Sequence, residues 1–284
     1  MERQVRRIAV IGGGTMGVGI AYVCAQAGGE VVVVEKDDAR AQAMELVIRD
    51  TSSGAVKRGK LNDAEAVALQ GRVKRISAIA DLPEGFDLIV ESVFEDIDLK
   101  RTVLAEASTR SPSLLATNTS ALSIDALSEA VPDKANFLGM HFFNPVWSLK
   151  LVEIVRGKMS ADAAVATAQE FAHWMGKESL VVRDIPGFAT SRLDLIASLE
   201  AMRMLESGVT SAEEIDRAAT LAYRHPVGPL RLSDIVGLDV RLDVARALEA
   251  AHGSRFAPPQ ILIDMVKAGK LGEKSGQGFY DWPH

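Results

Sequence analysis

Cysteine is nearly absent from this sequence, since Cys24 is the single one among 284 residues. One thiol excludes an internal disulfide and is too little for a cysteine-rich metal site. No apolar stretch reaches the roughly 18 residues that would span a bilayer. The apolar run near the start leads into glycines and not into a cleavage site, so a targeting peptide is not indicated. We therefore expect a cytoplasmic protein with no metal and no membrane association.

Positive charge is also in the minority, with 32 Lys and Arg residues against 38 Asp and Glu residues and a formal net charge of -6. This balance excludes a strong, chain-wide attraction to nucleic acid, so any phosphate must be bound by local groups. The chain is otherwise ordinary in composition, being 48% hydrophobic and 25% charged. Such a composition is typical of a globular protein of one large or two modest domains.

Short β-branched runs alternate with helical patterns in the first part of the chain, which is typical of a parallel sheet covered by helices. The expected strands are 7–11, 30–34, 72–76, 87–91, 114–117 and 136–142. Helices are expected to start at Thr15, Asp38, Asn62, Ile97 and Ile124. Two further strands near 151–155 and 178–182, with a helix at 161–175 between them, extend the same sheet.

The sequence changes character at Pro186-Gly187. Beyond this point apolar residues such as Leu193 and Ile196 recur at intervals of three and four, and β-branched runs disappear. We therefore predict an α/β protein with a Rossmann-type, mostly parallel sheet in residues 1–185 and an all-helical domain in residues 186–284.

A glycine-rich motif, Gly12-Gly13-Gly14-Thr15-Met16-Gly17, joins the first expected strand to the first helix. In such a motif Gly12 permits the tight turn, Gly14 lets the backbone approach a pyrophosphate, and Gly17 lets helix and strand pack closely. The anion is expected at the helix N-terminus, where unpaired N–H groups favour negative charge. The alternative is a glycine-rich turn without a ligand.

The second expected strand ends at Glu35, where an acid accepts hydrogen bonds from the ribose hydroxyls of a dinucleotide. The same carboxylate repels a 2′-phosphate, so the sequence favours NAD over NADP, although the neighbouring Lys36 weakens this preference. A solvated acid at a strand end is the alternative. Because strand, glycines, helix, strand and acid occur in the required order, we predict an NAD site.

Glu95 and Lys100 follow the fourth expected strand. The carboxyl ends of such strands open onto the crevice where the nucleotide lies, so both side chains are candidates for the nicotinamide half. An acid at a helix N-terminus and a surface lysine explain the same pattern equally well.

Hydride transfer from an alcohol needs a base for the hydroxyl proton, and histidine has the pKa that fits neutral pH. His141 ends an expected strand on the same side of the sheet as the glycine loop. The other histidines are best explained by packing or surface positions: His173, His225, His252 and His284. His141 is therefore the candidate base, with a structural histidine as the alternative.

Glu153 interrupts the apolar run 149–155 shortly after His141. A carboxylate in such a strand is costly unless it is paired, and a chain reversal through Asn144-Pro145 can bring it beside His141. Paired with one ring nitrogen, it would orient the imidazole and stabilise its protonated form, as an orienting group does in a catalytic triad.

Four hydrogen-bonding side chains end the fifth expected strand, in the string Thr117-Asn118-Thr119-Ser120. They are suited to holding the substrate hydroxyl and carbonyl oxygens, or to capping the next helix. Capping explains Ser123 better than Ser120.

Taken together, these strings resemble the bacterial 3-hydroxyacyl-CoA (3-hydroxybutyryl-CoA) dehydrogenase family. Matching strings occur in family order across nearly the whole chain: Gly12 to Gly17, Glu91 to Asp96, Thr117 to Ser120, His141 to Pro145, Leu151 to Val155, Pro186 to Phe188, His225 to Pro229 and Lys274 to Tyr280. The resemblance implies an NAD-dependent dehydrogenase acting on a short-chain acyl-CoA, and a homodimer formed through the helical domain.

The resemblance also implies residue roles. His141 is catalytic and held by Glu153, while Ser120 and Asn144 contact the substrate oxygens. The residues implied to touch the nucleotide are Glu35, Glu95, Lys100, Ser120, Asn144 and Lys274. For the coenzyme A moiety the candidates are Ser53, Lys57 and Lys60, which would otherwise be read as a solvated face.

One position departs from the family pattern, because Ser191 stands where the family string Gly-Phe-x-x-Asn-Arg carries asparagine. Serine keeps a donor and an acceptor but is shorter, so its contact to the substrate or to Ser120 is expected to be water-mediated. The departure bears on turnover or acyl preference more than on the reaction class.

Two competing interpretations stay open from the sequence. A dehydrogenase of a free hydroxyacid or sugar acid, like the gulonate dehydrogenases that resemble lens crystallins, shares the glycine loop and the His–Glu pair. A non-catalytic protein could also keep the fold, although the joint presence of Ser120, His141, Asn144 and Glu153 argues against it.

Overall fold

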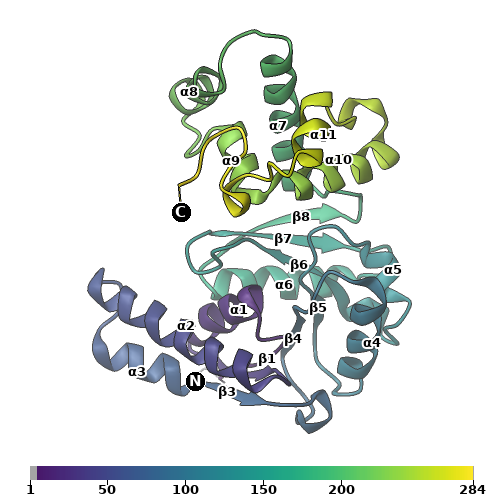
Figure 1. Ribbon diagram of the computed structural model, residues 1–284. Coiled ribbons are helices and arrows are strands. Elements are labelled where there is room, and N and C mark those ends of the chain that lie inside the picture. Colours follow the sequence, from purple (N-terminus) through teal and green to yellow (C-terminus); the bar gives the residue numbers. More distant parts are fainter. Residues whose placement is uncertain (1–4, 284) are drawn as a thin grey trace. The chain divides into compact units, whose positions relative to one another are not determined.

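The computed structural model describes residues 5–283 and divides into two compact units, Met1–Ile185 and Pro186–His284. His284 lies outside the described residues. In the first unit eight strands form one sheet in the order β3-β2-β1-β4-β5-β6-β7-β8 (Figure 1). The strands are β1 (Arg7–Ile11), β2 (Glu30–Val34), β3 (Val73–Ile76), β4 (Leu88–Glu91), β5 (Leu115–Thr117), β6 (Phe137–Phe142), β7 (Leu151–Arg156) and β8 (Glu178–Arg183).

All neighbouring strands are parallel except β6 and β7, which are antiparallel. The predicted α/β class with a mostly parallel sheet is therefore confirmed, and every expected strand is present within one residue at each end. Parallel strands need covered faces because both sides of such a sheet are apolar. The single antiparallel pair arises where a short connection returns the chain directly, without a crossover helix.

The helices of the first unit cover both faces of the sheet (Figure 1). They are α1 (Thr15–Gln26), α2 (Asp38–Lys57), α3 (Asp63–Gly71), α4 (Ile97–Ser108), α5 (Ile124–Ser128) and α6 (Asp162–Trp174). Residues of α1, α2 and α6 pack against one face, which includes Val10, Val90 and Met140. Gly139 points to the opposite face, where a Cβ would lie 2.8 Å from Ile124 of α5. His141 lies two residues further along the same strand and therefore belongs to this second face.

Helix starts in the first unit follow the capping signals of the sequence. Asp37 caps α2 by accepting from the Arg40 N–H, and Asn62 forms a capping box with Glu65 at the start of α3. Ser123 caps α5, as expected from the sequence, by accepting from the Ala126 N–H. Each cap satisfies backbone donors that the first helical turn leaves unpaired.

The second unit is helical, with α7 (Thr190–Glu206), α8 (Ala212–Tyr223), α9 (Pro229–Val236), α10 (Leu238–His252) and α11 (Gln260–Lys267). Its core is formed by leucines and other apolar residues that recur at helical spacing, among them Leu195, Leu199, Leu242 and Leu262. The same spacing predicted helices in the sequence, because positions three and four apart share one helix face.

Two buried aspartates organise the end of the second unit. Asp234 is fully buried and accepts from the Phe279 and Tyr280 backbone N–H groups and from Trp282 Nε1, each at 2.9 Å. Asp216 accepts from the Tyr280 hydroxyl at 2.8 Å. The string from Lys274 to Tyr280 thus has a structural reason for its glycines, since a Cβ on Gly278 would overlap the Asp234 carboxylate.

Candidate active site

The glycine loop connects β1 to α1 in the conformation that the sequence predicts. Gly12 has a φ of +106°, and a Cβ there would lie 2.6 Å from the Ser92 carbonyl oxygen. A Cβ on Gly17 would overlap the Gly12 carbonyl, so the close helix–strand contact requires glycine. A Cβ on Gly14 would meet nothing within 4 Å, so the loop backbone is open to an approaching ligand on this side.

Glu35 holds the glycine loop from the end of β2. Its Oε2 accepts from the Gly13 N–H at 3.0 Å and its Oε1 accepts from the Asp37 N–H at 2.9 Å. The side chain is 6% exposed and faces the cavity beside the loop. Each carboxylate oxygen has a further lone pair, so the acid can accept from ribose hydroxyls while it keeps both backbone bonds.

A cavity of about 790 Å³ extends from the glycine loop to the end of β6, and all the residues that line it belong to the first unit. At one end its walls include Gly12, Gly14 and Glu35, and at the other end Ser120 and His141. The arrangement fits NAD, because an open glycine loop at a helix N-terminus and an acid at the next strand end meet in one elongated space.

His141 and Glu153 lie side by side near the end of the cavity. The register of the antiparallel pair β6 and β7 sets them directly opposite each other, so their side chains share one face. His141 Nδ1 lies 2.8 Å from Glu153 Oε2. Glu153 is fully buried and His141 is 7% exposed. The structure thus brings the two predicted residues together, in an arrangement that can orient an imidazole and stabilise its charge.

Glu95 accepts several hydrogen bonds from the loop that follows β5. Its Oε1 accepts from the Thr119 hydroxyl at 2.5 Å, from the Ser120 N–H at 2.9 Å and from the Ser120 hydroxyl at 3.2 Å. Thr119 Oγ1 in turn accepts from the Leu122 N–H at 2.9 Å. Glu95 and Ser120 both line the cavity, whereas Thr119 serves the turn before α5.

Lys100 lies in the wall behind the cavity and not among its lining residues. Its ammonium is fully buried and donates to Glu91 Oε1 at 2.8 Å, to the Val93 carbonyl and to the Asn118 carbonyl. Glu95 Oε2 lies 3.5 Å from it. A direct contact between Lys100 and the nucleotide stays a prediction.

Glu91 is a site residue to which the sequence analysis assigned no role. It is fully buried at the end of β4 and accepts from Lys100 and from the Thr117 hydroxyl at 2.6 Å. Burial raises the pKa of this carboxyl, and the charge of Lys100 opposes the shift. The signal in the sequence was an acid that ends an apolar strand, followed by a lysine in the next helix.

Asn118 was expected to help hold the substrate or to cap a helix, and the structure gives it another bond. Its Oδ1 accepts from the Phe142 N–H at 2.9 Å, which ties the end of β5 to the residue after His141. Asn144 follows in an exposed position on the cavity wall, in a segment whose Asn144–Pro145 peptide bond is cis.

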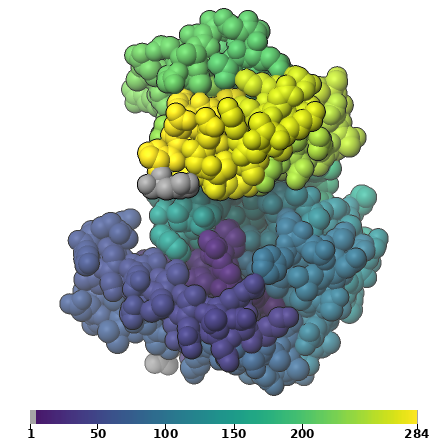
Figure 2. All heavy atoms as spheres, in the orientation of Figure 1, coloured from purple at the N-terminus to yellow at the C-terminus, as the bar shows by residue number. Residues whose placement is uncertain are grey.

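The remaining candidates are not among the residues that line this cavity. Ser53, Lys57 and Lys60 are exposed on α2 and the turn after it, a segment that forms part of the surface in Figure 2. Ser191 on α7 is half-buried, and Lys274 Nζ donates to Asp239 Oδ2 at 2.6 Å, which lowers the pKa of Asp239. Both belong to the second unit, and their contacts with substrate and nucleotide stay predictions.

The other described histidines are not among the residues that line this cavity. His173 is exposed on α6, and His225 lies beside the ring of Tyr223. His252 Nε2 lies 2.9 Å from the Pro186 carbonyl oxygen. No group of three or more potential metal ligands occurs in residues 5–283. In the same part of the chain no helix has the length and apolar character needed to cross a membrane.

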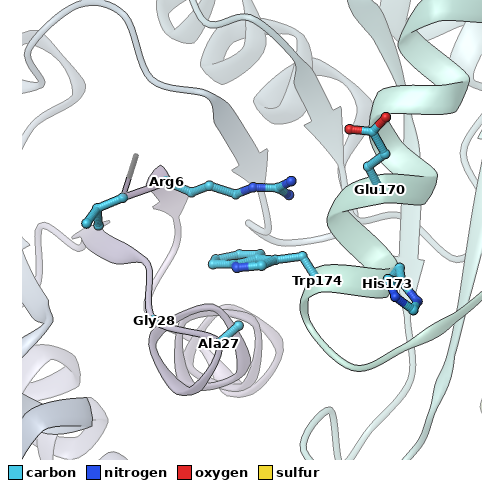
Figure 3. A pocket seen from close by; sticks show the side chains of 7 residues that line it. Arg6, Ala27, Gly28, Glu170, His173 and Trp174 are labelled. Atoms are coloured by element: carbon cyan, nitrogen blue, oxygen red, sulfur yellow. The ribbon is translucent and has the colours of Figure 1, made fainter. Parts of the chain in front are cut away.

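A second cavity, of about 610 Å³, lies at the amino end of β1 and is shown in Figure 3. The Arg6 guanidinium lies 5.1 Å from the centroid of the Trp174 ring and 4.6 Å from that of Phe171. His173 lines the rim from α6, and Gly28 lines it after the end of α1. The stacked arginine joins β1 to α6, so this cavity is a packing feature at the opposite end of the strand from the glycine loop.

Similar proteins indicate the family to which this chain belongs. A family model described as "3-hydroxyacyl-CoA dehydrogenase, NAD binding domain" matches residues 7–185, and one described as "3-hydroxyacyl-CoA dehydrogenase, C-terminal domain" matches residues 187–282. The 3-hydroxybutyryl-CoA dehydrogenase of Mycobacterium tuberculosis is 38% identical over 287 residues, with 99% of this chain and 100% of the relative covered.

A probable 3-hydroxybutyryl-CoA dehydrogenase of Deinococcus radiodurans is 37% identical over 279 residues, with 97% of this chain and 100% of the relative covered. The crystal structure of (S)-3-hydroxybutyryl-CoA dehydrogenase from Ralstonia eutropha superimposes with a TM-score of 0.94 at 34% identity, and covers 99% of this chain and 100% of its own. The chain therefore belongs to the 3-hydroxyacyl-CoA dehydrogenase family, and residues 7–185 form its NAD-binding domain.

Proposed function

We propose that this chain oxidises the 3-hydroxyl of a short-chain 3-hydroxyacyl-CoA to the 3-keto group, with His141 as the general base. The observation that carries the proposal is the His141–Glu153 pair at 2.8 Å, of which His141 lines the cavity that begins at the glycine loop. NAD, when bound, supplies the hydride acceptor. Relatives of this chain bear the name 3-hydroxybutyryl-CoA dehydrogenase, which supports a short acyl group.

His141 moves the proton in this proposal. Because Nδ1 is engaged by Glu153, the exchange with the substrate hydroxyl is assigned to Nε2. The C3–H bond then breaks with transfer of hydride, the C–O bond becomes a carbonyl, and the hydroxyl proton remains on the imidazole. Glu153 balances the resulting positive charge, which a buried position would otherwise disfavour.

Ser120 and Asn144 are proposed to hold the substrate oxygens. Both line the same cavity as His141, and Ser120 is held in place by Glu95 through its backbone N–H and its hydroxyl. The Ser120 hydroxyl donates to Glu95, and it serves a substrate oxygen as a donor by exchanging this bond for one to the substrate, while its backbone N–H keeps Ser120 in place. The Asn144 amide supplies donors suited to a carbonyl oxygen.

The coenzyme A moiety is proposed to contact Ser53, Lys57 and Lys60. The ammonium groups of Lys57 and Lys60 lie on one exposed segment, and their positive charge is opposite to that of the coenzyme A phosphates. This contact distinguishes a thioester substrate from a free acid.

A homodimer through the helical unit is supported by exposed apolar side chains there. Leu193, Val209, Leu221 and Tyr223 are 70%, 62%, 71% and 75% exposed in the single chain. Surfaces of this kind are typical of interfaces between subunits.

The decisive experiment compares substrates. NADH formation from 3-hydroxybutyryl-CoA and from free 3-hydroxybutyrate is measured at equal concentrations, with NAD and then with NADP. We expect activity with the thioester and NAD, and little with the free acid. Preference for the free acid would indicate a hydroxyacid dehydrogenase, and absence of NADH with both substrates would favour a non-catalytic role.

A further inference from the structure

Lys177 is a buried ammonium outside the cavity. It lies between α6 and β8 and is 7% exposed. Its Nζ donates to the Val146 carbonyl oxygen and, at 2.6 Å, to the Leu149 carbonyl oxygen. Burial lowers the pKa of Lys177. Since burial of a charge is costly, the backbone carbonyls that compensate it must be well placed.

The two carbonyls belong to the segment 143–150 that connects β6 to β7. This segment directly follows β6, whose last two residues are His141 and Phe142, and it contains Asn144. It forms a turn in which the Ser148 and Leu149 N–H groups donate to the Pro145 carbonyl at 3.0 and 3.1 Å. Lys177 therefore binds two carbonyl oxygens of this turn, and Asn144 lies just before the turn begins.

The same segment is held from another side by α1, the helix that begins at the glycine loop. Val146 is 1% exposed and packs on Gly19, where a Cβ would lie 2.6 Å from Val146 Cγ2. The rings of Trp147 and Tyr22 meet edge to face, with centroids 5.9 Å apart. The segment is thus fixed between α1 and Lys177, with little room to shift.

We propose that Lys177 is a positioning residue, which holds segment 143–150 so that Asn144 and His141 keep their places on the cavity wall. Lys177 does not line the cavity itself, so it acts through the segment and not on the substrate. The expected effect of Lys177 on turnover rests on the proposed function. The expected effect of Lys177 on the mobility of segment 143–150 does not depend on that function.

The test replaces Lys177 by methionine, which has similar length but no donor. The matched control is Lys150→Met, because Lys150 is an exposed lysine at the end of the same segment. Three quantities are measured: amide hydrogen exchange of peptides covering 143–150, NAD affinity by titration, and kcat and KM with 3-hydroxybutyryl-CoA.

We expect Lys177→Met to speed exchange of the Ser148 and Leu149 amides at least tenfold and to lower kcat about 10- to 100-fold, because small misplacements of reacting groups cost about this much. NAD affinity should stay within about twofold. Lys150→Met should resemble the wild type in all three.

Unchanged exchange in segment 143–150, or unchanged kcat alongside faster exchange, would overturn the positioning role. If Lys177→Met does not fold, Lys177→Gln carries the same test, since its amide retains donors and should give intermediate values. If the wild type is inactive with the thioester, the proposed function fails, while the exchange measurement still decides whether Lys177 immobilises the segment.

Discussion

Glu153 and Glu91 are two fully buried carboxylates, and each is paired with a basic side chain. Glu153 faces His141 and Glu91 faces Lys100. Removing one member of such a pair leaves the other uncompensated in a site of low polarity, which costs more than the pair itself contributes. At the residue scale the two pairs are distinct, because only the first includes a side chain that lines the cavity.

The general-base role is tested by His141→Gln. Glutamine keeps much of the size and hydrogen-bonding capacity of the ring but cannot take the hydroxyl proton, so kcat should fall by roughly 10²- to 10⁴-fold. NAD affinity, measured by titration, should remain. His173→Gln, at an exposed histidine of α6, is the control and should be fully active. Near-normal turnover in His141→Gln would show that another group is the base.

Glu153→Gln tests the orienting role. The variant retains a hydrogen-bonding side chain but loses the charge that stabilises protonated His141. We expect a lower maximal kcat and a shift of the acid limb of the pH–rate profile to lower pH, because the imidazole then loses its proton more easily. A profile identical to that of the wild type would contradict the pairing as a functional one.

At the scale of elements, the ends of β4, β5 and α4 are joined by the Glu91–Lys100 pair. The Thr117 hydroxyl donates to Glu91, and the Asn118 carbonyl accepts from Lys100. Through these bonds one buried pair supports the loop that carries Ser120. The arrangement explains why an acid and a lysine are tolerated where the surrounding sheet is apolar.

Lys100→Met should destabilise the fold by about 3 to 5 kcal/mol at pH 8, because an unpaired carboxylate is left buried. Burial already raises the pKa of Glu91 above its ordinary value of 4.5, and loss of Lys100 raises it further. A carboxyl with a raised pKa binds its proton more tightly in the folded state, so the variant should be least affected below about pH 4.5 and lose stability as the pH rises. Urea unfolding between pH 4 and 8 measures this.

The double variant Lys100→Met with Glu91→Gln is the control for that experiment. It has no charge at these two buried positions, so its stability relative to the wild type should change much less with pH. Equal pH dependence in the single and double variants would assign the effect to another group.

The segment from Gly278 to Trp282, at the end of the helical unit, is held by the buried carboxylate of Asp234. Gly278→Ala places a methyl group against the Asp234 carboxylate, which accepts three N–H groups from this segment. We expect a loss of about 1 to 3 kcal/mol and a lower Tm. Gly71→Ala, at the end of α3, is the control because its Cβ would meet nothing within 4 Å. Equal melting temperatures for the two variants would argue against a stabilising role of the contacts between Asp234 and this segment.

At the scale of the whole molecule, exposed apolar side chains of the helical unit are the feature that a single chain leaves unexplained. Leu221 is 71% exposed on α8. In the proposed homodimer Leu221→Asp should weaken association, and light scattering after gel filtration should report a shift from dimer toward monomer mass. Leu46→Asp, at an exposed leucine of α2, should leave the dimer intact. A wild-type protein that is monomeric at all concentrations would end the dimer proposal.

Much of the fold was predictable because its determinants are local. The alternation of β-branched runs with helical spacing located the strands within one residue, and Gly12 and Gly17 required glycine for reasons of backbone shape that hold in any such loop. His141 was singled out because it ends a strand on the side of the glycine loop, and the strand order of the structure agrees with that placement.

Other features depended on contacts between distant segments. Lys100 looked in the sequence like a surface lysine or a nucleotide ligand, and the fold buries it against Glu91. Lys177 carried no signal, because its acceptors are backbone carbonyls, which every residue has.

The sequence alone determined the fold class, NAD as the cofactor and the choice of His141 and Glu153 as candidates, since strand patterns and turn chemistry are set by neighbouring residues. Only the tertiary structure decided that β6 and β7 pair antiparallel with His141 directly opposite Glu153. The reason is register: a shift of one residue would turn Glu153 to the other face of the sheet, and register is fixed by packing across the whole sheet and not by the strand itself.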